Sequence, residues 1–269
     1  GGKSSFFPLV EQIILKNDLQ SCEYVEPFAG GAGLAIKLLF RGIVGRIHLN
    51  DLDPAVYAFW HSAINNTDQL CGMIESATLS VDEWEKQRAI LRKRDKSNLL
   101  ELAFATFYLN RTNVSGILDG GIIGGMRQNG KYKMDARYNP STSVRKIRRI
   151  AQHRESVTVT NFDAVDLLRA DASSNLKFYN IDPPYVGRGA DLYTNYSEES
   201  DHMELKNLVS SMANPWIVTY DDTDFIRNLY SEYRFINPRI YYSIGRRRYE
   251  REIMYFSHAC RIPSEKEVP

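Results

Sequence analysis

The chain has 269 residues, of which 43% are hydrophobic and 25% are charged, a balance that is ordinary for a soluble globular protein with one sizeable domain. No apolar run approaches the length of a membrane span and no signal peptide is visible, which argues against a membrane protein and favours a cytoplasmic one. The three cysteines are scattered and odd in number, so the sequence indicates neither a disulfide framework nor a zinc site.

A glycine-rich turn follows the first predicted strand. The elements expected before position 54 are a helix from Ser4 or Ser5 to about Leu19, a strand at Glu23–Pro27, a helix through Leu39 or Phe40 and a strand at Arg46–Leu49. Between the first strand and its helix lies the turn Phe28–Gly33, whose glycines allow the backbone to approach a ligand closely. A dinucleotide fingerprint that began at Gly31 would need a glycine where the chain has Ile36, so the pattern disfavours a nicotinamide cofactor.

Two acids follow the second strand. In such folds an acid about 20 residues after the glycines grips a ribose diol. Asp51 lies nearest the strand end and is the candidate for that role, with plain helix capping as its alternative. Asp53 precedes Pro54 and is expected to cap the next helix.

A long helical excursion then interrupts the alternation of strands and helices. The expected helices are Ala55–Ile64, Asp68–Glu75, Val81–Lys93 and Asn98–Leu109, and a polar, glycine-rich loop runs from Asn110 to Pro140. This stretch is too long for one crossover between strands, and loops of that length are usually functional. We therefore expect a main domain at residues 1–54 and 141–269 and an inserted subdomain at 55–140. A disordered surface loop is the alternative for the loop.

Basic residues concentrate at two places in the second half of the chain. The net charge of +1 says nothing about nucleic acid by itself, but local basic patches can bind a polyanion on one face. Two clusters stand out, and solvated surfaces are the alternative for both: Arg145, Lys146, Arg148, Arg149 and Arg154, and then Arg246, Arg247, Arg248 and Arg251.

Strands and helices alternate again in the second half. The expected elements are a helix at Ser143–Gln152, a strand at Val157–Thr160, a helix through Leu168, a strand at Leu176–Ile181, a helix at Glu199–Met212, a strand at Trp216–Tyr220, a helix at Thr223–Tyr230 and two closing strands at Phe235–Ile244 and Glu252–Ser257. The sequence therefore predicts an α/β fold with a mostly parallel sheet and an antiparallel C-terminal hairpin. The polar stretch Val186–Ser200 is a candidate lid over a substrate.

The chemistry centres on Asp182-Pro183-Pro184-Tyr185, which directly follows a buried strand. Ligands of open α/β sheets bind beyond the carboxyl ends of strands, and two prolines make a rigid turn there. The Asp182 carboxylate and the Pro183 carbonyl can accept both hydrogens of a planar amino group. The Tyr185 ring offers a stacking face for a base taken out of its helix. A chance strand end before a Pro-Pro turn is the alternative.

The chain resembles the Dam-like family of DNA adenine-N6 methyltransferases. The matching residues, in the family's order, are Gly1-Gly2-Lys3, Pro27–Gly33, Asp51, Asn110-Arg111-Thr112, Asp182–Tyr185 and Asp201-His202. The resemblance implies a Rossmann-like sheet that binds S-adenosylmethionine, a mainly helical inserted subdomain that recognises its target, and transfer of a methyl group to a flipped adenine in duplex DNA. No metal is implied, and a monomer on DNA is the simplest case.

The resemblance also implies residue roles. Adenine would be held by Asp182, Pro183, Pro184 and Tyr185. The cofactor would be bound by Lys3, Phe28, Ala29, Gly30, Gly31, Gly33, Asp51, Asp182 and, near its adenine, Asp163. DNA would be contacted by Arg111, Asn113, Arg127, Lys131, Lys133, Arg246 and Arg247. The alternatives are an RNA-adenine or protein-glutamine methyltransferase and a catalytically silent DNA-binding regulator on the same fold. A restriction-modification, phage or housekeeping role is left open.

Overall fold

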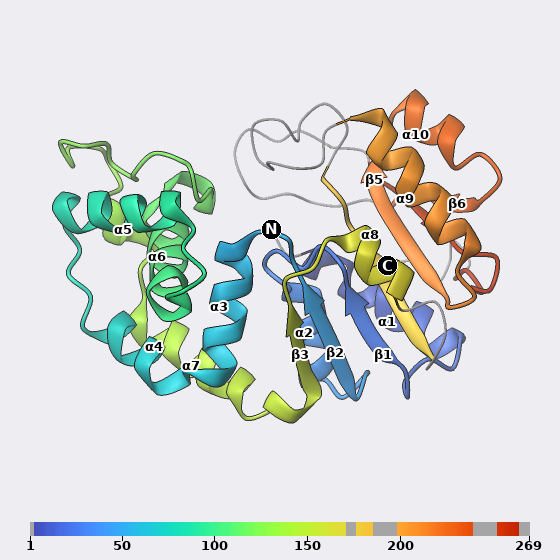
Figure 1. Ribbon diagram of the computed structural model, residues 1–269, viewed down its shortest axis with the longest axis horizontal. Coiled ribbons are helices and arrows are strands. Elements are labelled where there is room, and N and C mark those ends of the chain that lie inside the picture. The colour runs from blue at the N-terminus through green and yellow to red at the C-terminus, as the bar shows by residue number, and fades with distance from the viewer. Residues whose placement is uncertain (1–2, 171–175, 185–197, 239–251, 264–269) are drawn as a thin grey trace. The chain divides into compact units, whose positions relative to one another are not determined.

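The computed structural model describes residues 3–170, 176–184, 198–238 and 252–263, and the chain divides into two compact units. The first, which we call the sheet unit, comprises Gly1–Asp51 and Ser156–Pro269. The second, the helical unit, comprises Leu52–Glu155. Figure 1 shows the helices and strands of each unit.

A seven-stranded sheet with the order β3-β2-β1-β4-β5-β7-β6 forms the centre of the sheet unit. Its strands are β1 (Glu23–Glu26), β2 (Arg46–Asn50), β3 (Val157–Thr160), β4 (Lys177–Ile181), β5 (Trp216–Asp221), β6 (Arg234–Ile236) and β7 (Glu252–Phe256). The first five pair in parallel, whereas β7 is antiparallel to both β5 and β6. The predicted mostly parallel sheet with an antiparallel end is confirmed.

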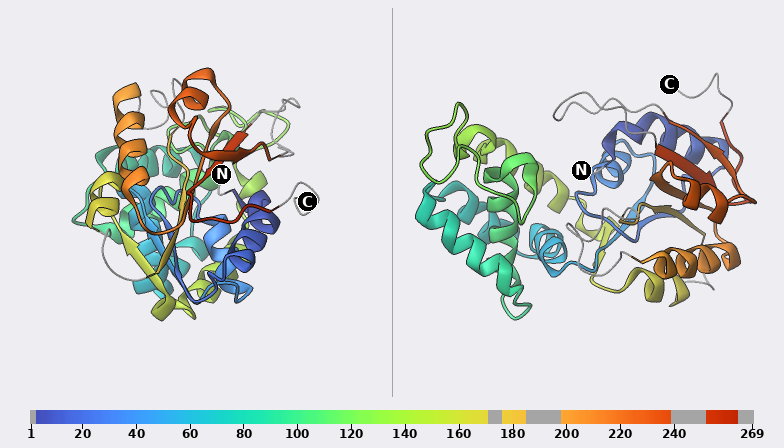
Figure 2. Two further views of the ribbon diagram at one scale, coloured as in Figure 1. Left: turned by 90° about the vertical axis from the view of Figure 1, so that its right-hand side faces the viewer. Right: turned by 90° about the horizontal axis from the view of Figure 1, so that it is seen from above.

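Helices cover both faces of this sheet, which explains why the central strands are apolar almost throughout. The helices of the unit are α1 (Phe7–Lys16), α2 (Gly33–Phe40), α8 (Ala164–Ala170), α9 (Glu199–Ser211) and α10 (Asp224–Leu229), with the short turn η1 (Ser4–Phe6) at the start. Figures 1 and 2 show α1 and α2 on one face and α8 and α9 on the other. On the second face, Leu168, Leu205 and Ile226 from the helices pack against Tyr179 and Val218 of the strands.

The strand order reverses direction between β1 and β4. From β1 the chain steps outward to β2 and β3, and it then returns to β4 on the other side of β1. In open α/β sheets the crevice beyond the carboxyl ends of the two strands at such a reversal is where ligands bind. This topology makes neighbours of two turns, the glycine-rich turn after β1 and the Pro-Pro turn after β4.

The helical unit is a bundle with a core of its own. Its main helices are α3 (Pro54–Asn65), α4 (Thr67–Glu75), α5 (Val81–Lys93), α6 (Leu99–Thr112) and α7 (Pro140–Ala151), with short turns η2 (Val114–Gly116), η3 (Met134–Arg137) and, where the units meet along the chain, η4 (Arg154–Ser156). The helix α6 lies at the centre, and Phe104, Phe107 and Tyr108 on it belong to the buried cluster. Buried residues occur on nearly every face of this helix, as expected for a helix that is surrounded by other elements.

Several boundaries differ from those that the sequence predicts. The helical unit extends beyond 55–140 because Val144 and Ile147 of α7 pack into its core. The helix α6 runs three residues past Leu109, because the backbone N–H of Asn113 still bonds to the Leu109 carbonyl at 2.8 Å.

Other predicted segments lie partly outside the described residues. Of the expected lid, residues 186–197 are outside them, and its last two residues begin α9. Of the expected strand at 235–244, the structure describes β6 and the two residues that follow it.

The core of the sheet unit gives a direct test of this packing. Leu205 of α9 is fully buried, whereas Met203 on the same helix is 46% exposed. Leu205→Ala should therefore lower the free energy of unfolding by about 2–5 kcal/mol, because it removes buried methyl groups and leaves a cavity. The matched control Met203→Ala should change it by less than about 0.5 kcal/mol. Urea denaturation followed by circular dichroism measures both, and equal effects would contradict the assigned face of α9.

Candidate functional site

Asp182 lies immediately after β4, at the strand reversal of the sheet. Its side chain is 25% exposed, and its Oδ1 atom lies 3.4 Å from the Nζ atom of Lys3. The two prolines that follow it are both buried, so the turn is anchored as well as rigid. A carboxylate is therefore presented at the edge where open sheets bind ligands, with an ammonium beside it.

Two acids from neighbouring strands contact this ammonium, and a third lies beside one of them. Glu252, the first residue of β7, is 1% exposed, and its Oε2 atom accepts a hydrogen bond from Lys3 Nζ at 2.7 Å. Asp221 ends β5 and pairs in register with Glu252. Burial raises the pKa of Asp182 from 3.8 to about 6; Lys3 opposes that rise, while Glu252 and Asp221 add to it. Asp182 is thus mostly ionised at neutral pH but close to its titration range.

The position of Lys3 is set by an unusual backbone conformation. Its φ of 40° lies in the left-handed region, which costs a residue with a side chain of the order of 1 kcal/mol. Its carbonyl accepts a hydrogen bond from the N–H of Phe6 at 2.9 Å, which starts η1. The Lys3 ammonium lies 5.3 Å from the centre of the Phe6 ring and contacts Asp182 and Glu252.

The glycine-rich turn after β1 lies at the neighbouring strand end. Gly30 has a φ of +45°, and a Cβ built there would meet open space, so glycine is needed for the backbone conformation rather than for packing. The N–H of Gly30 donates to the Oδ2 atom of Asp51 at 2.8 Å. Ala32, at the start of α2, also has a left-handed φ of 42°. A strained turn with open space above it and a carboxylate at its rim has the features of a ligand-binding turn.

A fully buried side chain, Asn50, joins the ends of the first three strands. Its Nδ2 atom donates to the carbonyls of Pro27 and Phe162, both at 3.0 Å. Its Oδ1 atom accepts from Thr160 Oγ1 at 2.7 Å and from the N–H of Phe162 at 2.9 Å. Asn161 adds a bond of 2.7 Å to the Asp51 carbonyl. These bonds hold the turn after β1 and the loop after β3 on either side of Asp51.

Asp163 caps the start of α8. Its Oδ1 atom accepts hydrogen bonds from the N–H groups of Val165 at 2.8 Å and Asp166 at 3.4 Å, as a helix N-cap does. Beside it, Phe162 presents an aromatic ring that is 56% exposed. The exposed ring is the more available of the two for contact with an apolar ligand.

Glu26 is a buried acid beneath the glycine-rich turn. It ends β1, is 5% exposed and accepts a hydrogen bond from the Tyr24 hydroxyl at 3.1 Å. Burial raises its pKa to about 8, and the charge of Asp182 adds to the rise. At neutral pH Glu26 is therefore largely protonated, which leaves Asp182 as the ionised member of the two.

The predicted DNA-contacting residues of the helical unit differ in their availability. Arg127, Lys131 and Lys133 are exposed on the loop after η2. They alternate with apolar side chains that are also exposed, Met126 at 50% and Tyr132 at 64%. Loops that combine basic and aromatic side chains in this way suit nucleic acid.

Two other residues of the predicted set are less exposed, Asn113 fully buried and Arg111 partly buried. Asn113 is fully buried, where its Oδ1 atom accepts from Trp84 at 2.7 Å and its Nδ2 atom donates to the carbonyls of Ile117 and Leu118 at 2.9 Å. It therefore shapes the loop and is not available to DNA. Arg111 belongs to the last turn of α6, and its pKa is lowered by burial and by the nearby Arg137.

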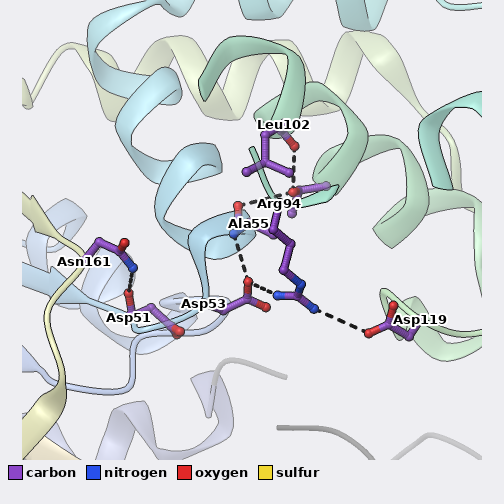
Figure 3. Close-up of polar contacts among 8 residues, drawn as sticks. Asp51, Asp53, Ala55, Arg94, Leu102, Asp119 and Asn161 are labelled. Carbon is purple, nitrogen blue, oxygen red and sulfur yellow. Dashed lines mark hydrogen bonds and ion pairs between the residues drawn. The ribbon is translucent and has the colours of Figure 1, made fainter. Parts of the chain in front are cut away.

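The start of the helical unit is fixed by an ion-pair network (Figure 3). As predicted, Asp53 caps α3, since it accepts from the N–H of Ala55 at 2.9 Å. The guanidinium of Arg94 bonds to Asp53 and also lies 3.6 Å from Asp119 in the loop. Arg94 thus ties the loop that bears the basic residues to the first helix of the unit.

Three predicted residues, Tyr185, Arg246 and Arg247, lie outside the described residues. Within the described part of the chain, no group of three or more His, Cys, Asp or Glu side chains is arranged to hold a metal ion. No helix there has the length and apolar character needed to cross a membrane.

Sequence reasoning missed Glu252, Asn50, Glu26 and Arg94. Only Glu26 carried a local signal, because an acid at the end of an otherwise apolar strand next to a glycine-rich turn is a candidate for a site. The contacts of Glu252 and Asn50 join residues up to 249 positions apart, so no local pattern announces them.

Comparison with known proteins agrees with these features. The sequence model of the D12 class N6 adenine-specific DNA methyltransferases matches residues 1–244. The type II methyltransferase M.CviBI of Paramecium bursaria Chlorella virus NC1A is 26% identical over 214 residues, which are 78% of this chain and 77% of the viral protein.

Solved structures give weaker matches, which carry no weight in the assignment. Thermoplasma acidophilum 1320 has a TM-score of 0.38 and 10% identity over 95% of this chain and 88% of its own. The rRNA methyltransferase AviRa of Streptomyces viridochromogenes has a TM-score of 0.36 and 14% identity over 93% and 84%. The family match spans nearly the whole chain, and the chain therefore belongs to the D12 class N6 adenine-specific DNA methyltransferases.

Proposed function

We propose that this DNA adenine methyltransferase uses Asp182 and the Pro183 carbonyl to hold the amino group of an adenine that has been flipped out of duplex DNA. The observation that carries the proposal is the position of Asp182, an ionised carboxylate at the strand reversal of the sheet, 3.4 Å from Lys3. Membership of the family supplies the substrate class. S-adenosylmethionine is the proposed methyl donor.

The residues around the strand reversal suit this donor. Asp51, fixed at the rim of the glycine-rich turn by Gly30, would accept hydrogen bonds from the ribose hydroxyls. The turn Phe28–Gly33, with open space above Gly30, would lie against the methionine part. Phe162 would cover an apolar face of the adenine, with Asp163 holding the helix beside it. When bound, the cofactor supplies an electrophilic methyl group on a sulfonium centre.

The protein's own contribution is to make the amino nitrogen reactive. In adenine its lone pair is delocalised into the ring, so that the nitrogen is a poor nucleophile. By accepting one hydrogen each, the Asp182 carboxylate and the Pro183 carbonyl draw the nitrogen toward tetrahedral geometry and localise the lone pair. Once the amino nitrogen has taken the methyl group that the bound donor would supply, it would lose one proton, and the Asp182 carboxylate would accept it. A carboxylate whose pKa is raised to about 6 is a better base for this step than an ordinary aspartate.

Reaching this site requires the base to leave the helix, which costs a few kcal/mol. Stacking on the ring of Tyr185 would offset part of that cost. An assay of tritiated-methyl transfer to DNA, RNA and protein distinguishes adenine in DNA from the alternative substrates, an RNA adenine and a protein glutamine. A catalytically silent regulator would label none of them. Labelling of adenine in duplex DNA alone is the expected result.

The two units differ in net charge, and the positive charge of the helical unit favours DNA binding by that unit. Residues 52–155 contain 16 lysines and arginines but 11 aspartates and glutamates, whereas the rest of the chain contains 18 and 22. A positive unit attracts the phosphate backbone, and this attraction weakens as salt rises. We propose that Arg127, Lys131, Lys133 and the partly buried Arg111 contact phosphates or base edges. The buried Asn113 is not part of this proposal.

Asp182 gives the first test of the proposal. Asp182→Ala should abolish methyl transfer, and Asp182→Asn should lower kcat by about 10²-fold or more, because one charged acceptor is lost. In the wild type, kcat/KM should fall as the pH drops through about 6, since the pKa of this carboxyl is raised to about 6 and the protonated form cannot accept the hydrogen.

The exposed Asp166 supplies the matched control, because its carboxylate is 72% exposed and pairs only at the surface with Arg169. Asp166→Asn should keep both the turnover and the acidic limb of the wild type. Near-normal turnover of Asp182→Ala, or a flat profile between pH 5 and 8, would refute the role of Asp182.

The loop gives a second test, measured as the dependence of DNA affinity on salt. Replacing Lys131 by alanine should weaken binding to all sequences and reduce the slope of log K against log salt by about 1, because one phosphate contact is lost. Lys86 of α5, 64% exposed and outside the loop, is the control and should leave the slope unchanged on replacement. An unchanged slope for Lys131→Ala would remove this residue from the interface.

A further inference from the structure

Glu252 is a buried charge that the proposed reaction does not use. Its side chain is 1% exposed, and a carboxylate in that position is costly unless a cation pairs with it. The cation is Lys3, whose Nζ atom lies 2.7 Å from Oε2. The two residues are 249 positions apart, so the contact joins the two ends of nearly the whole sequence.

The direction of β7 explains why this carboxylate reaches the functional edge of the sheet. The strands β4 and β5 end at that edge, and because β7 runs antiparallel to β5, its first residue lies there. In the register of the sheet Glu252 pairs with Asp221, the last residue of β5. A parallel strand in this place would have put its first residue at the opposite edge.

The two contacts of Lys3 are unequal. Its ammonium is 2.7 Å from Glu252 but 3.4 Å from Asp182, so the first contact is a short hydrogen bond and the second a looser ion pair. An ammonium has three donors and can serve both acids together. Glu252 is the tighter of the two ties.

We propose that Glu252 is a positioning residue, which holds the Lys3 ammonium against Asp182 and thereby keeps the Asp182 carboxylate aimed and ready to accept the adenine amino hydrogens. Glu252 acts through Lys3 and does not touch the substrate. The inference rests on the proposed role of Asp182, and it adds a residue on a distant strand to the machinery of the reaction.

If Glu252 acted only through the effect of its charge on the pKa of Asp182, its loss would have a different result from the one that positioning predicts. The negative charge of Glu252 contributes to the raised pKa of Asp182. If Lys3 stayed in place without Glu252, the pKa of Asp182 would fall, and the ionised carboxylate would be at least as abundant as before. Loss of Glu252 would then leave turnover intact at pH 8. Positioning by Glu252 predicts instead that turnover falls at that pH, because Lys3 is released.

The test measures kcat and KM for the methylation of duplex DNA at pH 8 by Glu252→Gln, which has nearly the same volume but no charge. We expect kcat to fall about tenfold or more, because a misplaced reacting group lowers the rate steeply, with KM for DNA within about twofold. The exposed Glu155, whose side chain is 91% exposed, is the control, and Glu155→Gln should behave as the wild type. Wild-type kcat in Glu252→Gln would overturn the proposal.

A double-mutant cycle with Lys3→Met separates positioning from a general weakening of the fold. The double variant removes both partners of the Lys3–Glu252 contact, so neither is left buried without the other, and it should fold even if one single variant does not. If Glu252 acts through Lys3, the double variant is no slower than Lys3→Met alone; rate losses that multiply would contradict the shared route. The melting temperatures of the three variants are measured on the same samples. They should not rank the variants in the same order as the methylation rates do.

The result for Asp182→Asn distinguishes a failure of the positioning role of Glu252 from a failure of the proposed role of Asp182. If Asp182→Asn turns over like the wild type, the proposed function fails whatever Glu252 does. If Asp182→Asn is inactive and Glu252→Gln is not impaired, the positioning role alone fails.

Discussion

The partly buried ammonium of Lys3 and the two carboxylates that it contacts, Asp182 and Glu252, form the interaction on which the functional edge depends. The fold brings Asp182, Asp221 and Glu252 to adjacent strand ends, where their charges repel one another. Burial raises the pKa of Asp182, because it disfavours the charged form, and the Lys3 ammonium opposes that rise. An ionised Asp182 is the form that can accept a hydrogen from an amino group. The chemistry thus follows from charge balance in a partly buried place.

The sheet supplies this place through its topology. The reversal between β1 and β4 brings together two turns that are about 150 residues apart in the chain, one rich in glycine and one rich in proline. The first is open and strained, and the second is rigid and buried. Asn50 joins the ends of β1, β2 and β3 and so fixes the turn after β1 and the loop after β3 that border Asp51. The helical unit adds positive charge in a separate compact body with its own core.

Local patterns in the sequence predicted most of the elements and the two turns. The apolar runs before Asp51 and Asp182 were short and bounded by breakers, and both are strands in the structure. Asp53 before a proline predicted a helix cap, which is confirmed. Failures arose where a side chain's environment is set from far away. Asn113 has a residue type common in DNA contacts, yet Trp84 and two loop carbonyls bury it. Glu252 lay in a predicted strand with no sign that its partner was Lys3, because that contact depends on the direction of β7.

The titration of the Asp182 carboxyl group, followed by carbon-13 NMR in the wild type and in Lys3→Met, tests the electrostatic basis of this site most directly. We expect a midpoint of about 6 in the wild type, and a higher midpoint in Lys3→Met because the cation that opposes the effect of burial is gone. Midpoints near the ordinary 3.8 in both proteins, or a midpoint that does not move when the ammonium is removed, would contradict the claim that Lys3 keeps a buried Asp182 ionised.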